Sequence, residues 1–169
     1  VRFMSSIITN LPANEYEYYC VGSSNHGGDF DWAANIALAQ ILETMNIIAN
    51  VSDTFISHFS IYDSTYILCH GKDSRDMKSN LPLTLNDKTI TYVNTYIDYN
   101  NLHNNITFVK GDLHQSATTY CNFFKYKSVG SIFGSSEWIH KNFGNTKACC
   151  DYTIVDANNQ SLDGLIQLQ

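Results

Sequence analysis

Residues 106–114 read Ile-Thr-Phe-Val-Lys-Gly-Asp-Leu-His, and this stretch decides how the rest of the chain is interpreted. Ile106–Val109 predicts a short buried strand, because β-branched and aromatic residues favour strands. The strand breaks at Gly111, and two side chains able to bind ligands, Asp112 and His114, follow at once. In α/β proteins, ligands bind in the loops at the carboxyl ends of strands. The stretch therefore predicts a strand-end site in an α/β fold.

Two earlier stretches of the sequence repeat this pattern. Glu17–Gly22 predicts a buried strand that runs into Asn25 and His26, and Thr65–Cys69 predicts another that runs into His70. These groups stand far apart along the chain, so only a sheet that lines up its strand ends can bring them together. A single histidine at the end of a strand is weak evidence. The repeated order of strand and ligand is more specific.

Helices and further strands are predicted around these stretches. Apolar residues at spacings of three and four predict a helix over Trp32–Ala49, capped by Asp29 or Asp31. The remaining predicted elements are the strand Phe55–Ile61, which forms a hairpin with Thr65–Cys69, the helix Asn86–Asn100, the strands Asn122–Tyr126 and Tyr152–Val155, and a short helix over Ser135–Asn142. Because no internal repeat or linker interrupts the chain, residues 1–169 are expected to form one domain.

The composition excludes several classes of protein. The chain has 169 residues, of which 10 are basic and 16 acidic, for a net charge of −6, and 44% are hydrophobic. That hydrophobic fraction excludes a disordered chain. No apolar run reaches the ~18–20 residues that a membrane span needs, so we expect no membrane partner. Proteins that wrap nucleic acid need a basic face, which scattered cations in an acidic chain do not provide.

The five cysteines of the sequence indicate a reducing compartment. A chain of this length does not need disulfides for stability, and Cys149-Cys150 lacks the spacing of zinc and redox sites. We therefore expect reduced thiols and a cytoplasmic protein.

The side chains at the three strand ends form a mixed set of metal donors. Imidazole nitrogen, carboxylate oxygen and amide oxygen together suit Mn²⁺, Fe or Zn²⁺ better than Mg²⁺ or Ca²⁺ alone. Such ions could also explain how an acidic protein handles phosphate, because the ions supply the positive charge.

The order Ser24-Asn25-His26-Gly27, Cys69-His70-Gly71 and Gly111-Asp112-Leu113-His114 resembles the last three of five sequence blocks in calcineurin-like metallophosphoesterases, especially the small bacteriophage members. The resemblance implies a layered β-sandwich flanked by helices and a centre of two divalent metal ions, with Mn²⁺ favoured and Fe or Zn²⁺ as alternatives. It implies that Asn25, His70 and Asp112 bind one ion, Asp112 standing where a histidine is usual, and that His114 binds the other. It implies that His26 stays off the metals and acts on the phosphate as the catalytic residue.

The sequence also departs from this family. Ser24 replaces a glycine of the third block, Gly27 replaces its acidic residue, and the first two blocks have no counterpart upstream. The resemblance therefore implies a metallophosphoesterase-like domain that lacks its N-terminal part. The missing ligands would come from an N-terminal segment or another chain.

Three hypotheses for function remain open at this point. The first is a metal-dependent phosphoesterase of phage type that hydrolyses phosphate mono- or diesters, including nucleic acid or nucleotides, in the cytoplasm of an infected host cell or in a virion. The second is a catalytically incomplete domain with a structural or assembly role. The third is a nucleophilic hydrolase that uses Cys69 and His70, which neighbouring positions on a strand disfavour because they point to opposite faces.

Overall fold

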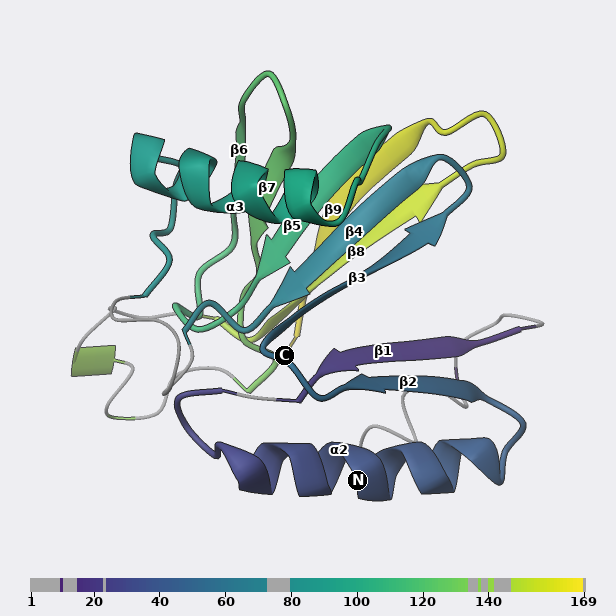
Figure 1. The fold of residues 1–169 in the computed structure, drawn as a ribbon. Helices are drawn as coiled ribbons and strands as arrows, with labels where there is room; N and C mark the ends of the chain where they lie inside the picture. The colour runs from purple at the N-terminus through teal and green to yellow at the C-terminus, as the bar shows by residue number, and fades with distance from the viewer. Residues whose placement is uncertain are drawn as a thin grey trace.

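A five-stranded mixed sheet forms the centre of the protein in a computed structural model (Figure 1), which describes residues 15–22, 24–72, 80–133 and 147–168 together with residues 10, 137, 140 and 141. The strand order is β3-β4-β5-β7-β6. The strands are β3 (Ile56–Ile61), β4 (Ser64–Cys69), β5 (Asn105–Lys110), β6 (Ala117–Tyr120) and β7 (Lys125–Ser128). β4, β5 and β7 are parallel to one another, whereas β3 and β6 are antiparallel edge strands.

The hydrophobic core lies between this sheet and helix α3 (Asp87–Tyr99), which covers one face (Figure 1). Ile67, Phe108, Tyr126 and Val93 are fully buried there, and the rings of Phe108 and Tyr126 stack. The helix begins where the side chain of its N-cap residue, Asn86, accepts a hydrogen bond from the backbone N–H of Thr89 at 2.9 Å, satisfying a free amide of the first turn.

A second unit consists of β1 (Glu17–Val21), α2 (Asp29–Glu43) and β2 (Ile48–Ser52). The two strands pair in parallel from Glu17↔Ile48 onward, and α2 packs on them through Leu38 and Leu42. The ring of Tyr19 in β1 stacks on Phe59 in β3 with centroids 4.2 Å apart. This contact sets the end of β1 beside the central sheet.

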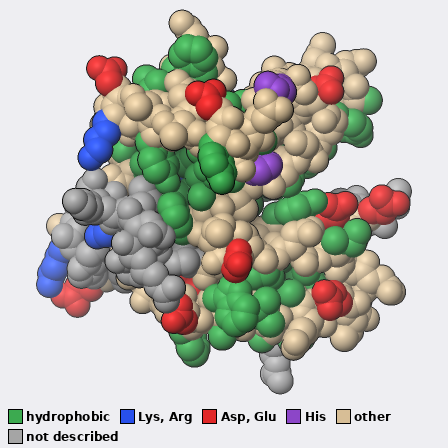
Figure 2. All heavy atoms as spheres, in the orientation of Figure 1, with side chains coloured by type: hydrophobic (Ala, Val, Ile, Leu, Met, Phe, Trp, Pro, Cys, Tyr) green, Lys and Arg blue, Asp and Glu red, His purple; other side chains and the backbone are tan. Residues whose placement is uncertain are grey.

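Helix α2 is apolar on its outer side as well as its inner side. Phe30 is 78% exposed, Trp32 and Ile41 are also exposed, and Met45 is exposed in the turn that follows the helix. Hydrophobic side chains gather over the lower part of the molecule where α2 lies (Figure 2). A helix that is hydrophobic all round is usually buried on both sides, so this face is a candidate contact surface.

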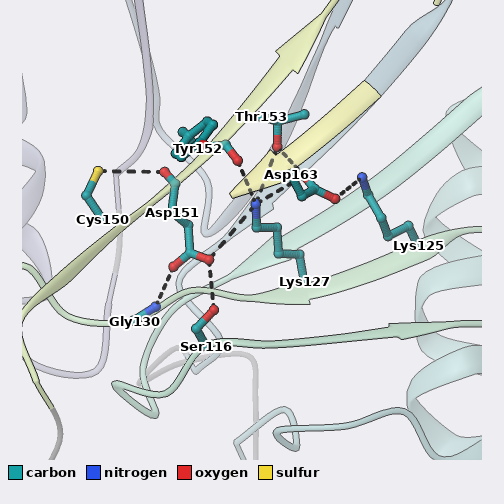
Figure 3. Close-up of polar contacts among 9 residues, drawn as sticks. All are labelled: Ser116, Lys125, Lys127, Gly130, Cys150, Asp151, Tyr152, Thr153 and Asp163. Carbon is teal, nitrogen blue, oxygen red and sulfur yellow. Dashed lines mark hydrogen bonds and ion pairs between the residues drawn. The ribbon is translucent and has the colours of Figure 1, made fainter. Parts of the chain in front are cut away.

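A hairpin of β8 (Cys149–Val155) and β9 (Ser161–Gln167) packs on the face of the central sheet opposite α3 (Figure 1). Charged side chains make this contact (Figure 3). Lys127 Nζ lies 3.2 Å from Asp163 Oδ1 and 4.0 Å from Asp151 Oδ1, and Lys125 Nζ lies 2.8 Å from Asp163 Oδ2. Lys127 points to the hairpin because its neighbour Tyr126 points into the core, as alternation along a strand requires.

The structure confirms the predicted α/β class with layered sheets and flanking helices, and it corrects the predicted helix Trp32–Ala49. The helix begins at Asp29 and ends at Glu43, and its N-cap position is Gly28, with no side-chain cap. Asn46 has a left-handed backbone (φ 59°), which ends the helical turn. The β-branched residues after it then form β2.

Strands account for the other differences. β6 and β9 were not predicted, and the strand predicted over Asn122–Tyr126 starts later, at Lys125. The predicted helix Ser135–Asn142 falls largely outside the described residues. Among the described residues, no helix is both long and apolar enough to cross a membrane.

Candidate metal centre

Three strand-end loops bring His26, His70 and Asp112 together. The ligand atoms of these three side chains all lie within 4.8 Å of one another. His26 Nε2 is 3.8 Å from Asp112 Oδ1, and the rings of His26 and His70 meet edge to face with centroids 5.3 Å apart. The parallel register that pairs Cys69 with Lys110 makes β4 and β5 end at the same level, so the loops after them meet.

A glycine allows the two loops of the central sheet to approach closely. Gly71 has φ +111°, and a Cβ atom there would lie 3.0 Å from Cβ of Asp112 and 3.1 Å from the carbonyl oxygen of Gly111. Only glycine adopts that backbone conformation readily. Asp112 and His114 themselves have left-handed backbones, with φ of 73° and 56°. Such conformations in non-glycine residues are concentrated at functional sites.

His70 is held in the tautomer that a metal ligand needs. Its Nδ1 lies 3.2 Å from the carbonyl oxygen of Lys72, which can only accept a hydrogen bond, so Nδ1 carries the proton and Nε2 is left as the basic nitrogen. Burial lowers the pKa of His70, although the nearby Asp112 carboxylate raises it. His70 is therefore neutral at pH 7, as metal binding requires.

Asp112 is fixed by a second side chain from the far end of the preceding loop. Its side chain is 4% exposed, and Oδ2 accepts a hydrogen bond of 2.7 Å from Nδ2 of Asn80. This leaves Oδ1 as the oxygen that faces His26. A buried carboxylate held in one orientation is a suitable hard ligand for a divalent cation.

The loop after β1 is built around Ser24. Its hydroxyl donates to the carboxylate of Asp31 in the first turn of α2 and accepts the backbone N–H of His26 at 3.0 Å. Within the same loop, Oδ1 of Asn25 is buried, and none of the described residues donates a hydrogen bond to it. Buried oxygens are nearly always satisfied, so this oxygen, in the loop that also carries His26, is a candidate metal ligand. An amide oxygen, a neutral imidazole and a carboxylate are a donor set that suits a divalent transition metal.

The cluster opens into a cavity of about 410 Å³, which we call the strand-end cavity. Besides His26, His70 and Asp112, its lining residues are Gly111, His114, Val129, Gly130, Ser131 and Ile132. His114 thus lies on the wall of the cavity, although it is not a member of the three-residue cluster. All five side chains singled out from the sequence belong to the loops of this site.

His58, His103 and Cys69 take no part in the site. His58 Nδ1 lies 3.0 Å from the hydroxyl of Tyr96, and His103 is exposed on a loop. Cys69 is buried in the hydrophobic core, where its sulfur accepts the N–H of Gly71. The structure therefore contradicts a Cys69–His70 nucleophile and base. Asn80 and Ser24 were missed as supporting residues, because no sequence spacing reveals such contacts.

Comparisons with known proteins give only loose likenesses. No family model and no curated protein matches the chain. Among solved structures, a double mutant of Vps29 from Entamoeba histolytica has 9% sequence identity and a TM-score of 0.48, covering 99% of this chain and 89% of that one. A single mutant of the same protein has 10% identity and a TM-score of 0.45, covering 98% and 89%. Likeness at this level assigns the chain neither to a family nor to a function.

Proposed function

We propose that this chain binds a divalent transition-metal ion at the strand-end site and hydrolyses phosphate esters there. The observation that carries the proposal is the convergence of His26, His70 and Asp112 from three separate loops within 4.8 Å. The calcineurin-like order of the sequence, including the phage-type likeness, supports the same chemistry. Mn²⁺ is the ion we favour, because a carboxylate in place of a histidine suits a harder metal.

The burial of the side chains supports a division of roles. Asp112 is 4% exposed at its side chain, His70 is half-buried and Asn25 Oδ1 is buried, whereas the His26 side chain is 56% exposed. We assign Asn25, His70 and Asp112 to the metal ion. His26 lies on the solvent side of them, where a substrate enters, and we assign it to the phosphate.

The chemistry is the addition of one water molecule across an ester bond. A bound divalent ion supplies Lewis-acid charge, which polarises a phosphoryl oxygen and acidifies water. The water oxygen forms a bond to phosphorus, the ester P–O bond breaks, and the proton that water loses passes to solvent. His26 Nε2 donates a proton to the departing ester oxygen and regains one from solvent.

A second ion, as the resemblance implies, needs more ligands than this site shows. His114 on the cavity wall is the proposed ligand for it within the described residues. The others would come from an N-terminal segment or another chain. We place the protein in the cytoplasm, of an infected host cell if the phage-type likeness holds, on the strength of cysteines that form no disulfide pattern in the sequence.

The exposed apolar side of α2 favours a second candidate function. Phe30 and Ile41 of α2, with Met45 in the turn after it, form a surface of the kind that binds other proteins. A chain that binds metal without hydrolysis and uses α2 for contact would be an assembly component. Activity measurements separate it from the first candidate.

The experiment that tests the proposal is hydrolysis of bis-p-nitrophenyl phosphate by the full chain with and without Mn²⁺. We expect hydrolysis that requires Mn²⁺, that His70→Ala abolishes and that His103→Ala leaves unchanged, since His103 is an exposed residue outside the cavity. Mn²⁺ binding without hydrolysis of any phosphate ester would instead support the assembly role.

A further inference from the structure

Two cavities of similar size meet at the His26–His70 pair. The strand-end cavity lies on one side. The second, which we call the helix-side cavity, also measures about 410 Å³. Besides His26 and His70, its lining residues are Val21, Ser24, Asp31, Ala34 and Asn35. Among the residues that the structure describes, His26 and His70 alone are common to both linings.

We propose, building on the proposed function, that the substrate is a phosphodiester whose two substituents occupy the two cavities. The reacting phosphorus then lies at the junction, beside His26 and His70. Each cavity falls within the ~300–1,000 Å³ that small-molecule sites usually span, so each can hold one substituent. A monoester has one substituent and would leave one cavity without a ligand.

The charges of the two linings favour a diester as well. One carboxylate lines each cavity: Asp112 on the strand side and Asp31 on the helix side. Neither lining includes a lysine or arginine among the described residues. The nearby Lys110 is fully buried and donates to the carbonyl oxygen of Leu81. A phosphodiester carries one negative charge, whereas a monoester carries about 1.5 to 2 near neutral pH. The acidic lining therefore repels a monoester more strongly.

The same charges favour release of the product. Hydrolysis of a diester forms one bond between water oxygen and phosphorus and breaks one ester bond. It yields an alcohol and a phosphate monoester. The monoester gains negative charge on ionising, and the two carboxylates then favour its release. One substituent leaves from each cavity, so neither product blocks the next substrate.

The walls of the cavities differ in character. The strand-end cavity is lined by Val129 and Ile132 beside backbone of Gly111 and Gly130. In the helix-side cavity, the side-chain amide of Asn35 donates a hydrogen bond to the carbonyl oxygen of Val21. The carboxylate of Asp31 accepts one from the hydroxyl of Ser24. Ala34 is the smallest side chain on that wall and is exposed on α2. A large residue there would fill the helix-side cavity without disturbing the core.

The test compares bis-p-nitrophenyl phosphate with p-nitrophenyl phosphate on the full chain with Mn²⁺. We expect kcat/KM for the diester to be at least about tenfold higher, and Ala34→Trp to lower the diester value about tenfold and the monoester value by less. Ala37→Trp is the matched control, because Ala37 is an exposed alanine of the same helix that lines neither cavity, and it should change neither value. Thermal melts establish that both variants fold.

Two results would overturn the diester assignment while leaving the proposed function standing. One is an equal or higher kcat/KM for the monoester. The other is an equal loss of both activities in Ala34→Trp. Failure to hydrolyse either ester, with Mn²⁺ still bound, overturns the proposed function itself and the assignment with it.

Discussion

Asn80 donates a hydrogen bond of 2.7 Å from Nδ2 to Oδ2 of Asp112, and so it decides which carboxylate oxygen faces His26. The two residues are distant in sequence and meet only because the loops after β4 and β5 end at the same edge of the sheet. The contact fixes the orientation of a proposed metal ligand without Asn80 touching the ion.

Removing this contact should weaken metal binding. We expect Asn80→Ala to lower the affinity for Mn²⁺ roughly 10–100-fold, the usual effect of losing a residue that orients a ligand. Isothermal titration with Mn²⁺ measures it. Asn158→Ala, at an exposed turn between β8 and β9, is the control and should bind Mn²⁺ like the wild type. Unchanged affinity in Asn80→Ala would show that Asp112 does not depend on this hydrogen bond.

The backbone at Gly71 should be required for both stability and metal binding. Gly71→Ala places a Cβ 3.0 Å from Asp112 Cβ at a φ of +111°, and we expect a loss of about 2–3 kcal/mol in the free energy of unfolding. Gly28→Ala is the matched comparison, because Gly28 also has a positive φ but a Cβ there meets nothing within 4 Å. Because its ψ of −124° lies outside the left-handed helical region, Gly28→Ala should also lose about 1–3 kcal/mol, but it should keep its Mn²⁺ affinity. Urea unfolding and titration with Mn²⁺ measure the two effects. Equal losses of Mn²⁺ affinity in both variants would mean that the close contact between the loops does not hold the site.

The sequence predicted that the strand ends meet because the pattern that marks a strand end is local and occurs three times. A buried run followed by Gly, His, Asn or Asp indicates where a strand ends, and parallel pairing then gathers those ends. This is why the sequence predicted that His26, His70 and Asp112 lie close together, as they do, while their roles stay predictions. Asn80 could not be found, because its role depends on the path of a loop and on side-chain geometry.

The errors in the predicted elements also have physical causes. The helical periodicity continued past Glu43, but the left-handed conformation of Asn46 ended the helix and let Ile48 start β2. Strand β9 contains Asp163-Gly164, a pair typical of turns, yet Asp163 is held by Lys125 and Lys127 of the facing sheet. In the case of β9, tertiary contacts override the local preference.

The lysine contacts between the hairpin and the central sheet should matter for stability. Lys127 is 4% exposed and faces two carboxylates, so Lys127→Ala leaves the buried carboxylate of Asp151 without its lysine, while Asp163 keeps Lys125. We expect a loss of about 3–5 kcal/mol in the free energy of unfolding, measured in urea. Lys141→Ala removes an exposed pair with Glu137 and should change stability by less than about 0.5 kcal/mol. A small effect in both variants would show that the hairpin is held by other contacts.

Acid should weaken the same contact. Burial raises the pKa of Asp163, but hydrogen bonds from Lys125 and Thr153 outweigh it and hold the pKa at about 2, below the ordinary 3.8. The charged carboxylate therefore stabilises the fold above about pH 4, and this stabilisation is lost as the pH falls from about 4 to 2. Thermal melts across this range should show a steeper fall for the wild type than for Asp163→Asn. If the melting temperatures of the two proteins fell in parallel with pH, the charged carboxylate of Asp163 would not be the source of this stabilisation.

The account depends most directly on the metal centre, and isothermal titration of the full chain with Mn²⁺ tests it. We expect the wild type to bind Mn²⁺, and His70→Ala and Asp112→Asn each to lose more than the roughly 10–100-fold typical of a residue that only orients a ligand. Asparagine is chosen at position 112 because it tolerates the left-handed backbone there. Absence of Mn²⁺ binding by the wild type would contradict the account. Wild-type affinity for Mn²⁺ in both variants would also contradict it.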